Sequence, residues 1–442
     1  MVSNGTVEKQ APGAAPGQLE AAFGRPLALA SLSIHADDYT NTHPAVAPPM
    51  HVSTTFRYPR NPDELVPWSE ADPDDFESFY IYSREKSPTS TRYEAILTSL
   101  LGGPAISYAS GLAAFHAMMV FLNPRRVAIG GGYHGCHGIL RILHKLNGLE
   151  TVELEDDAAL ARLRPGDVIH VETPLNPTGE ARDLEFYRRR ADELGCWLTV
   201  DATFAPPPLL EPFRWGADIV MHSGTKYFGG HSDMLSGVLA VNPRWAASRT
   251  VPGQGKKEDE GGAEESKLTW VQQLREERLL LGGVMGSLEG WLGVRSLRTL
   301  ELRVQRQSQN AQRLVRWLAD EQARGEGVVA ELVHRVQHAS LQPEAADEGS
   351  WLARQMPNGH GPVFALWLAT EQLARRLPSK LRLFHHATSL GGVESLVEWR
   401  AMSDSTVDRR LIRVSVGVEA WEDLRDDLLQ GFQALKEDAG DR

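Results

Sequence analysis

The sequence predicts an α/β protein, with a mostly parallel sheet covered by helices on both faces and a smaller α/β domain at the C-terminal end. Short apolar strands alternate with helical segments from about Ile81 to Val294, the pattern of a parallel sheet with crossover helices. The clearest strands each end in a polar or glycine-rich turn, and they are residues 126–129, 167–171, 197–200 and 219–221. Between them, residues 183–194 show an amphipathic helical pattern that stops at Gly195.

The chain divides into three predicted parts. Residues 1–80 form an N-terminal extension and a subunit-contacting segment, residues 81–295 the large domain, and residues 296–442 the small domain. We expect residues 1–24 to be floppy, because they are rich in Ala, Gly, Pro and Gln. Residues 27–80 are irregular and proline-rich, and an ordered segment of that kind needs a packing partner. We therefore expect this segment to lie on a neighbouring subunit.

The second half of the chain continues with helices and then with strands. Residues 251–267 are rich in glycine and charge and are expected to be an exposed insertion. Helical periodicity follows at residues 270–280 and again at 297–318, where the helix is expected to link the two domains. Apolar strands are expected in the small domain at residues 363–367 and 411–416.

Composition narrows the class of protein. Hydrophobic residues make up 42% of the 442 residues and charged residues 24%, which is typical of a soluble globular chain. The formal charge of −12 argues against nucleic acid or an anionic membrane as a partner. No apolar run reaches the ~20 residues that span a bilayer. The two cysteines, Cys136 and Cys196, cannot form a disulfide framework, so a cytoplasmic location is expected.

A lysine and an aspartate stand at the ends of two predicted strands. Lys226 follows strand 219–221, and Asp201 directly ends strand 197–200. The carboxyl ends of parallel strands form the edge where ligands bind. A lone Lys is more often a solvated surface charge, but Asp201 starts no helix and so is not a helix cap. The pair suits pyridoxal phosphate (PLP), which needs a lysine amine and a carboxylate on its pyridine nitrogen.

Other residues can complete such a site. Gly111 and Leu112 begin a helical segment whose free amides could bind phosphate, although a Ser-Gly before a helix is commonly an ordinary cap. Ser223 and Thr225 flank the lysine with hydroxyl groups. Tyr133 follows three glycines at a strand end, where its ring can stack on a flat cofactor or pack on the protein.

Arg413 lies within an apolar strand, where a lone charge is costly unless it is paired. A substrate carboxylate and an internal Asp or Glu are equally plausible partners. His134, Cys136 and His137 could suggest zinc, but no second pair of ligands accompanies them, and we predict no metal site.

Together these stretches resemble the Cys/Met-metabolism family of PLP enzymes, also called the trans-sulfuration or cystathionine γ-synthase family, of fold type I. The resemblance runs from about residue 31 to 427. It rests on ordered motifs: Tyr82-Ser83-Arg84, Ser110-Gly111-Leu112, Glu172-Thr173-Pro174-Leu175-Asn176-Pro177, Asp201-Ala202-Thr203, Ser223-Gly224-Thr225-Lys226-Tyr227, Ser389-Leu390-Gly391-Gly392 and Arg413-Val414-Ser415-Val416-Gly417.

The resemblance implies a role for each matching residue. Lys226 holds PLP and moves protons, Asp201 pairs with the pyridine nitrogen, and Tyr133 stacks on the ring and assists catalysis. The remaining cofactor-binding residues are Gly111, Leu112, Thr203, Ser223 and Thr225, joined by Tyr82 and Arg84 from the adjacent subunit. The substrate-binding residues are Arg413, Ser389, Asn176 and Thr388. Sites shared in this way imply a homodimer, usually paired into a homotetramer.

The chain departs from the family pattern on the side that faces the substrate. Ser87 and Ala202 stand where the family usually has Asn, and His134-Gly135-Cys136 replaces Gly-Gly-Thr. Thr388 occupies the position where cystathionine-handling members commonly have Glu. Residues 399–405 replace the usual His-Pro-Ala-x-Met-Thr-His. The cofactor-binding residues of the family are therefore present, whereas the substrate-facing residues differ from the family pattern.

The function that the resemblance implies is γ-substitution on an activated homoserine such as an O-acyl ester. The reaction would pass through a vinylglycine-type intermediate that accepts a thiol, or a carbon or nitrogen nucleophile, at Cγ. The first alternative is a γ-lyase-type elimination from cystathionine or methionine that gives an α-keto acid. The second is a PLP-binding regulatory protein with little turnover. A serine hydrolase based on Ser223-x-x-Lys226 lacks its companion motifs.

Overall fold

Two β-sheets organise the part of the chain that the computed structural model describes, which comprises residues 15–41, 43, 45–67, 70, 80–250 and 268–440. The first sheet has seven strands, in the spatial order β1 (Ala105–Tyr108), β7 (Gly237–Val241), β6 (Ile219–Ser223), β5 (Trp197–Asp201), β4 (Val168–Glu172), β2 (Arg126–Ile129) and β3 (Glu150–Glu153). Neighbouring strands are parallel from β6 to β3, whereas β7 is antiparallel to β6 and to β1. The predicted mostly parallel sheet is confirmed.

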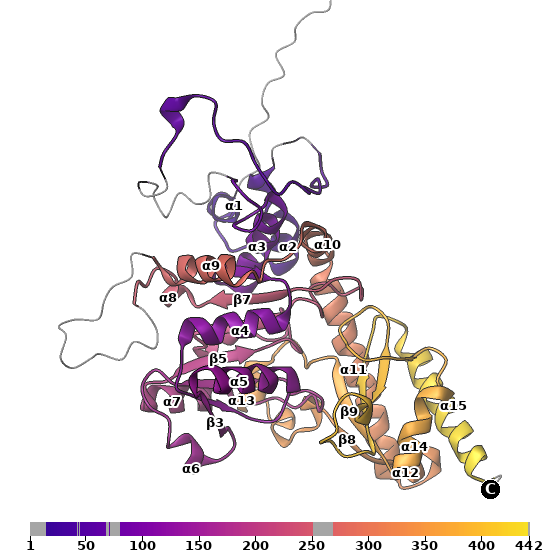
Figure 1. Cartoon of the computed structure of the whole chain (residues 1–442). Coiled ribbons are helices and arrows are strands. Elements are labelled where there is room, and N and C mark those ends of the chain that lie inside the picture. Colours follow the sequence, from indigo (N-terminus) through magenta and orange to yellow (C-terminus); the bar gives the residue numbers. More distant parts are fainter. Residues whose placement is uncertain are drawn as a thin grey trace, which may run out of the picture.

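Helices cover both faces of this sheet (Figure 1). They are α3 (Pro88–Leu101), α4 (Gly111–Leu122), α5 (His134–Asn147), α6 (Asp157–Leu160), α7 (Leu184–Leu194), α8 (Pro243–Ala246), α9 (Trp270–Leu281) and α10 (Ser287–Leu297). Strand β2 shows how alternating side chains serve both faces. Val127 and Ile129 pack in one core with residues of α4 and α5, while Ala128 packs in the opposite core with Leu184 of α7.

The second sheet has five strands, in the order β10 (His385–His386), β11 (Leu396–Trp399), β12 (Leu411–Ser415), β9 (Val363–Leu368) and β8 (Val333–Gln337). All its pairs are antiparallel except β10 with β11. The accompanying helices are α11 (Leu300–Arg324), α12 (Gly327–Leu332), α13 (Trp351–Gln355), α14 (Glu371–Arg376) and α15 (Trp421–Gly440).

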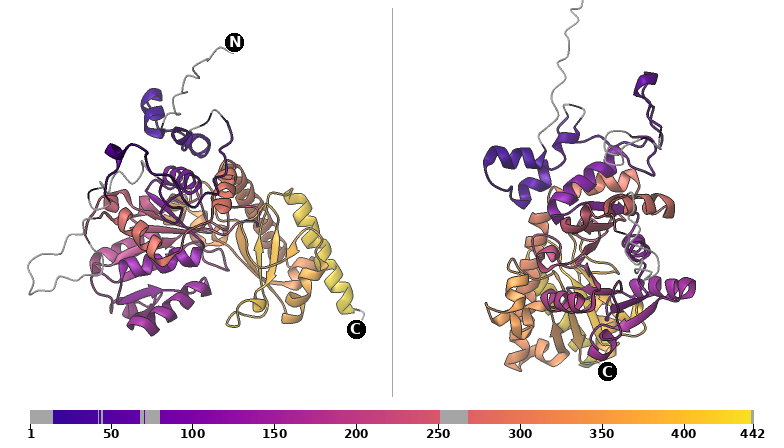
Figure 2. Two further views of the ribbon diagram at one scale, coloured as in Figure 1. Left: turned by 45° about the horizontal axis from the view of Figure 1, so that its top comes forward. Right: turned by 90° about the vertical axis from the view of Figure 1, so that its left-hand side faces the viewer.

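Helix α11 joins the two cores. Its first turns contribute Leu300 and Val304 to the core of the large sheet, and its later turns contribute Leu314 and Leu318 to the core of the second sheet. In Figures 1 and 2 this helix runs along the junction between the two sheets. We propose that it marks the domain boundary, which the sequence predicts near residue 295.

The N-terminal region differs in part from the sequence prediction. Residues 16–23 form helix α1 (Pro16–Phe23) instead of a floppy extension, because Pro16 suits the first helical position and Gly24 adopts a left-handed φ of 65° that ends the helix. Helix α2 (Leu29–His35) follows and packs on α3, within a stretch that is irregular elsewhere. The rest of the predicted extension, residues 1–14, and the predicted insertion, residues 251–267, lie outside the described residues.

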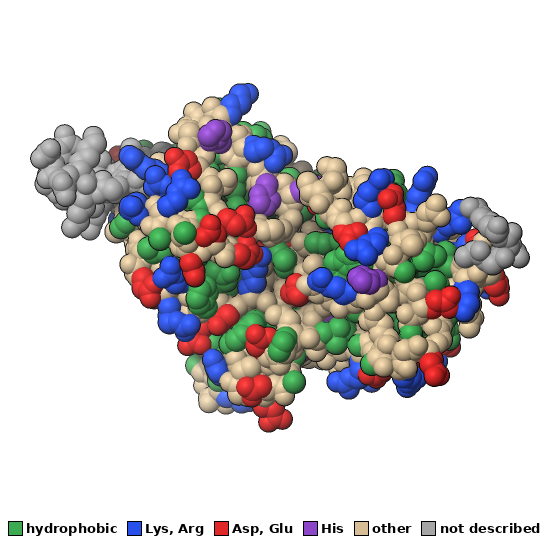
Figure 3. Space-filling view, turned by 90° about the horizontal axis from the view of Figure 1, so that it is seen from below, with side chains coloured by type: hydrophobic (Ala, Val, Ile, Leu, Met, Phe, Trp, Pro, Cys, Tyr) green, Lys and Arg blue, Asp and Glu red, His purple; other side chains and the backbone are tan. Residues whose placement is uncertain are grey.

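Charges of both signs are interspersed on the face that Figure 3 shows, with no large patch of one sign. Among the described helices, none is both long and apolar enough to cross a membrane.

Candidate active site

Three acidic or basic groups meet at the carboxyl edge of the large sheet. Strands β4, β5 and β6 are parallel neighbours, and their register places Glu172 opposite Asp201, and Asp201 opposite Met221. Lys226 follows the end of β6 by three residues. The structure therefore brings Asp201 and Lys226 to one edge of the sheet, as the sequence predicts.

Lys226 points toward the second sheet. Its Nζ donates a hydrogen bond to Ser389 Oγ at 2.7 Å. Burial, and after it the nearby Arg413 guanidinium, lower the pKa of the amine to about 8, while Glu398 acts in the opposite direction. The amine can therefore lose its proton near neutral pH, which an ordinary surface lysine cannot do.

The loop that carries Ser389 approaches Lys226 very closely. Ser389 has a φ of 82°, a left-handed conformation that is uncommon for any residue except glycine. Gly391 follows with a φ of 85°, and a Cβ at Gly391 would lie 3.0 Å from the carbonyl carbon of Lys226. The loop thus depends on glycine to place the Ser389 hydroxyl against the amine.

One carboxylate oxygen of Asp201 accepts hydrogen bonds within the protein, and the other is available to a ligand. Its Oδ1 accepts hydrogen bonds from the Thr203 backbone N at 2.9 Å and from Thr203 Oγ1 at 2.5 Å. In the described part of the chain, Oδ2 has no hydrogen-bond donor, so it is available to a pyridine N–H. Burial raises the pKa of Asp201, and the two Thr203 hydrogen bonds act against that rise.

Glu172 lies beside Asp201 and binds the backbone of two loops, one at Tyr133 and one at Asn176. It accepts the backbone N–H of Tyr133 at 2.8 Å and that of Asn176 at 2.7 Å. Burial, followed by the charge of Asp201, raises the pKa of Glu172 to about 8. Thr203 similarly joins two strand ends, because its Oγ1 also accepts the Ser223 backbone N–H at 2.8 Å.

The N-terminus of α4 forms a phosphate cradle against the loop that follows β6. Ser110 caps this helix by accepting the N–H of Ala113, whereas the first two amides, of Gly111 and Leu112, have no acceptor within the described residues. A Cβ on Gly111 would lie 3.1 Å from both Cβ and Oγ of Ser223. Glycine therefore lets the helix end meet Ser223, whose hydroxyl can donate to the same anion.

Thr225 is already engaged on the protein side. Its Oγ1 accepts a hydrogen bond from the Ser236 N–H at 3.0 Å and donates one to the Ser236 carbonyl oxygen at 3.2 Å. Ser236 Oγ in turn lies 3.5 Å from the Tyr93 hydroxyl. Thr225 therefore positions the loop in this structure, and its predicted contact with phosphate stays a prediction.

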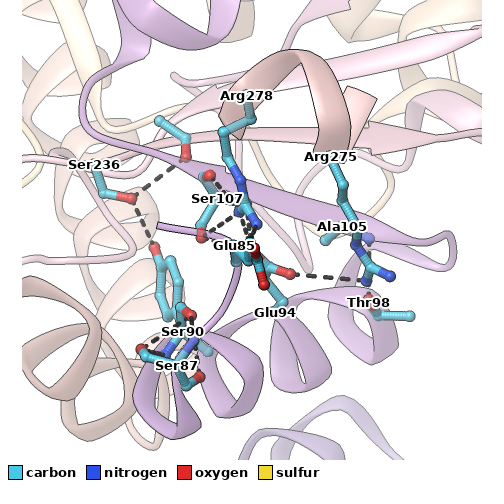
Figure 4. A network of polar contacts seen from close by, with 12 residues as sticks. Glu85, Ser87, Ser90, Glu94, Thr98, Ala105, Ser107, Ser236, Arg275 and Arg278 are labelled. Carbon is cyan, nitrogen blue, oxygen red and sulfur yellow. Dashed lines mark hydrogen bonds and ion pairs between the residues drawn. The ribbon is translucent and has the colours of Figure 1, made fainter. Parts of the chain in front are cut away.

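A buried ion pair joins elements that precede the cradle in the chain to helix α9 (Figure 4). Glu94 on α3 accepts Arg278 Nη1 from α9 at 2.6 Å and both the N–H and the hydroxyl of Ser107 on β1. Arg278 Nη2 also donates to the Glu85 carbonyl at 3.0 Å. One charged cluster thus joins two helices, the first strand and the loop that carries Tyr82.

Tyr133 caps the start of α5, and its half-exposed ring covers Gly135. A Cβ at Gly135 would lie 2.5 Å from the Tyr133 ring and 2.9 Å from Leu112. Burial raises the pKa of the Tyr133 phenol, as do Cys136 and Asp201, whereas Arg400 and Arg413 lower it.

Arg413 has the internal acidic partner that the sequence leaves open. Its Nη2 lies 2.6 Å from Glu398 Oε2 and donates to the Ser389 carbonyl at 2.8 Å, and its Nη1 donates to Asn176 Oδ1 at 3.1 Å. Burial lowers the pKa of Arg413 to about 10. The structure therefore brings three predicted substrate-binding residues, Arg413, Asn176 and Ser389, into one group.

Three predicted residues stand apart from this group. Thr388 is exposed and precedes the bend at Ser389. Tyr82 and Arg84 are also exposed, and the Arg84 guanidinium lies 5.5 Å from the centre of the Tyr82 ring. In the described chain neither residue contacts the Lys226 group, so any role in phosphate binding requires another subunit. No group of three His, Cys, Asp or Glu side chains that could hold a metal is found among the described residues.

The sequence predictions omitted Glu172, Glu398 and Arg400 as individual site residues. Glu398 is the cross-strand partner of Arg413 in the β11–β12 register. The signal that could have identified it is a single acidic residue inside the apolar segment 396–399, opposite a buried arginine. Arg400 follows directly and is itself buried, with an exposed fraction of 3%.

The arrangement fits PLP. Lys226 would hold the aldehyde, the open Asp201 oxygen would take the pyridine nitrogen, and Tyr133 would cover the ring. The free amides of Gly111 and Leu112 with the Ser223 hydroxyl would bind the phosphate. Among the described residues, Asp201 Oδ2 has no donor and the amides of Gly111 and Leu112 have no acceptor, so these groups are available to such a ligand.

Comparisons with known proteins agree with this geometry. A family model described as Cys/Met metabolism PLP-dependent enzyme matches residues 30–433. The cystathionine gamma-lyase of Bacillus subtilis is 31% identical over 375 residues, which cover 80% of this chain and 89% of that protein. The cystathionine gamma-synthase of Escherichia coli is 30% identical over 420 residues, which cover 88% and 93%. The crystal structure of metB from Corynebacterium glutamicum matches with a TM-score of 0.76 and 27% identity, covering 92% of this chain and 98% of that one.

Proposed function

This chain belongs to the family of Cys/Met metabolism PLP-dependent enzymes, and on that premise we propose that it replaces the γ-substituent of an O-acyl-homoserine by a nucleophile. A thiol is the first candidate nucleophile, and a carbon or nitrogen nucleophile is the second. Relatives named cystathionine gamma-synthase and O-acetylhomoserine (thiol)-lyase support this proposal.

One observation carries the proposal. The Lys226 amine, whose pKa is about 8, is hydrogen-bonded at 2.7 Å to Ser389, and the Ser389 carbonyl binds Arg413. A proton-transferring base therefore stands next to the guanidinium that suits an α-carboxylate. PLP, when bound, supplies the electron-accepting ring that acidifies the C–H bonds of an attached amino acid.

The chain's own residues then have defined roles. Arg413 and Asn176 bind and orient the α-carboxylate, which directs the Cα–H bond toward Lys226. Lys226 accepts that proton and can move between Cα and Cβ because its side chain is long and flexible. With PLP bound, Asp201 would pair with the pyridine nitrogen and favour its protonated form, and Tyr133 would cover the ring.

A substrate panel tests the proposal. The purified protein with PLP is incubated with O-acetyl- or O-succinyl-homoserine and with cysteine, sulfide, an amine or a carbon nucleophile. We expect mass spectrometry to show a γ-substituted amino acid whose formation needs both substrates. The same product must be absent with the Lys226→Ala variant. If no acyl-homoserine yields a γ-substituted product, the proposed substitution is wrong.

The second candidate is γ-elimination, which the similarity to cystathionine gamma-lyases favours. The same arrangement of Lys226 and Arg413 can release the γ-group without adding a nucleophile. In that case cystathionine or methionine alone would yield an α-keto acid at a rate that added thiol does not change. The panel separates the two reactions, because one product keeps its amino group and the other loses it.

We also propose a homodimer with shared sites, paired into a homotetramer, because Tyr82 and Arg84 are exposed and the described chain shows no contact between them and Lys226. Large apolar side chains in the segment before α3 are exposed as well. They are Tyr39, Val46, Met50, Val52, Tyr58, Leu65 and Val66. An apolar surface of this kind is typical of subunit contacts.

A further inference from the structure

Two buried arginines share one carboxylate at the substrate side of the site. Glu398 Oε2 lies 2.6 Å from Arg413 Nη2 and 3.1 Å from Arg400 Nη1. All three side chains are at most 5% exposed. Charges buried to this extent are stable only when they are paired, so a change at one of the three affects the other two.

Arg413 has little free capacity for a substrate. A guanidinium has five N–H groups, and a bidentate carboxylate needs two of them on neighbouring nitrogens. Nη2 belongs to both possible pairs. It already donates to the Ser389 carbonyl at 2.8 Å and forms an ion pair with Glu398 Oε2 at 2.6 Å. A substrate carboxylate must therefore compete for Nη2, and Glu398 is its charged competitor.

Glu398 has other partners that do not depend on Arg413. Arg400 Nη1 donates to it, and Ser403 Oγ donates to its second oxygen at 2.7 Å. Arg400 Nη1 also donates to Ser403 at 2.8 Å, which fixes the two donors together on the short helix η8 (Arg400–Met402) and its following turn. Burial would raise the pKa of Glu398, but Arg413, Ser403 and Arg400 outweigh it and hold that pKa below the usual value.

We propose that Glu398 is an exchangeable counter-ion of Arg413: the substrate's α-carboxylate takes its place on Arg413, and Arg400 retains the displaced Glu398. Arg400 and Glu398 are then positioning residues that set the affinity for amino-acid carboxylates. This inference rests on the proposed role of Arg413. It adds that residues 399–405, which replace the usual family motif, affect substrate binding through the Arg400 guanidinium.

The exchange predicts that Arg400→Met and Glu398→Gln change the affinity for a substrate carboxylate in opposite directions. In Arg400→Met, displaced Glu398 would lose its cationic partner, so carboxylate binding should weaken roughly tenfold. In Glu398→Gln the competitor loses its charge, so binding should tighten by about threefold or more. The double variant should return toward the unmodified protein, and Arg400→Lys should retain much of the affinity because its ammonium can still pair with Glu398.

The measurement is equilibrium binding to the PLP-loaded protein without turnover. L-norvaline, which has no γ leaving group, is titrated and its dissociation constant is read from the cofactor absorbance and from calorimetry. Butylamine, its analogue without the carboxylate, is titrated in parallel and should bind all variants alike. Arg409→Met, which changes an exposed arginine paired with Glu371, is the matched control and should bind as the unmodified protein does.

The outcomes separate this inference from the proposed function. If Glu398→Gln weakens norvaline binding as Arg400→Met does, Glu398 merely holds Arg413 in place and the exchange is wrong. An equal loss of butylamine affinity would also overturn it, because the effect would then not concern the carboxylate. If the binding pattern holds while no acyl-homoserine reacts, the proposed substitution fails and the exchange stands. Should Arg400→Met not fold, the direction of the affinity change in Glu398→Gln still decides, because the exchange requires tighter binding and a purely structural role of Glu398 requires weaker binding.

Discussion

At the scale of single residues, the surroundings of Lys226 decide what its amine can do. Nothing in its own side chain differs from that of a surface lysine, yet burial and the neighbouring Arg413 lower its pKa from 10.5 to about 8. A group that is largely uncharged at slightly basic pH can attack an aldehyde and accept a proton. The bend at Ser389 adds a hydroxyl partner at 2.7 Å.

The pH dependence of PLP attachment follows from this shift. Only the neutral amine attacks the aldehyde, and the neutral fraction grows as pH rises through the pKa. We expect the rate of covalent attachment to cofactor-free protein to rise with pH and to be half-maximal near the pKa of about 8. Stopped-flow absorbance measures that rate, with borohydride trapping on the Lys226 peptide as proof of the attachment point. A midpoint near the ordinary value of 10.5 would contradict the burial of the amine.

Asp201 provides a second test at this scale. Its open Oδ2 suits a protonated pyridine nitrogen, which an uncharged amide cannot support equally well. Asp201→Asn should still bind PLP but should lose roughly 10²- to 10³-fold in kcat, because it removes a fixed charge from the reacting centre. Steady-state kinetics at saturating PLP check this.

The matched control for Asp201→Asn is Cys136→Ser, which changes a buried neighbour that has no assigned role. It should keep most of the activity. Unchanged kcat in Asp201→Asn would remove Asp201 from the mechanism, and loss of activity in Cys136→Ser would show that the loop after Tyr133 takes part in the chemistry.

At the scale of elements, strand ends and helix ends locate the chemistry. Strands β5 and β6 deliver Asp201 and the Lys226 loop, and the start of α4 delivers free amides. The second sheet contributes Ser389 and Arg413 from the other side. Apolar packing holds these strands and helices in place, and the polar site residues lie at or just beyond their ends.

The buried pair of Glu94 and Arg278 gives an element-scale prediction. Glu94→Gln would leave the Arg278 guanidinium buried without its counter-ion, and the pair joins α3, α9 and β1 (Figure 4). We expect a loss of about 3 kcal/mol or more in the free energy of unfolding, measured from the urea dependence of fluorescence.

Arg275→Gln is the control for this loss, because Arg275 lies 3.8 Å from the same carboxylate and is more exposed, 35% against 3% for the side chain of Arg278. It should cost at most about 1 kcal/mol. If both variants unfold at the same urea concentration, the buried pair does not hold the three elements together.

At the scale of the whole molecule, the N-terminal segment extends away from the two sheets (Figure 2). It carries exposed Tyr82 and Arg84 on the loop that Arg278 anchors through the Glu85 carbonyl. An extended segment with exposed apolar side chains is explained if it lies on another copy of the chain, as the proposed dimer requires.

Mixing two inactive variants tests the proposed sharing of sites. Lys226→Ala lacks the amine, and the combined variant Tyr82→Phe with Arg84→Ala lacks the donors that would reach a partner's phosphate. Each alone should be inactive or nearly so, and activity should return after the two are unfolded and refolded together, because mixed dimers contain one complete site. Recovery is measured with the best substrate of the panel, and sedimentation checks that dimers form. Absence of recovery in confirmed mixed dimers would contradict shared sites.

Much of the large domain could be predicted from the sequence, because its strands are continuous apolar runs. The helix expected at residues 183–194 forms as α7 with Asp183 as its cap and Gly195 in the left-handed conformation. Strands β1, β3, β7, β8, β10 and β11 were not predicted, because segments of two to five residues carry only a weak pattern. Helix α1 was missed because none of its residues is buried, so its sequence shows no apolar face.

The sequence by itself determined the class of fold, the family and the pair Asp201 and Lys226, because strand order and motif spacing are local properties of the chain. Only the tertiary structure decided the partner of Arg413. Glu398 lies opposite it through strand pairing, and Arg400 reaches the same oxygen through a turn. The physical reason is that an ion pair depends on distances of a few ångströms between segments, and those distances exist only after the two sheets have packed.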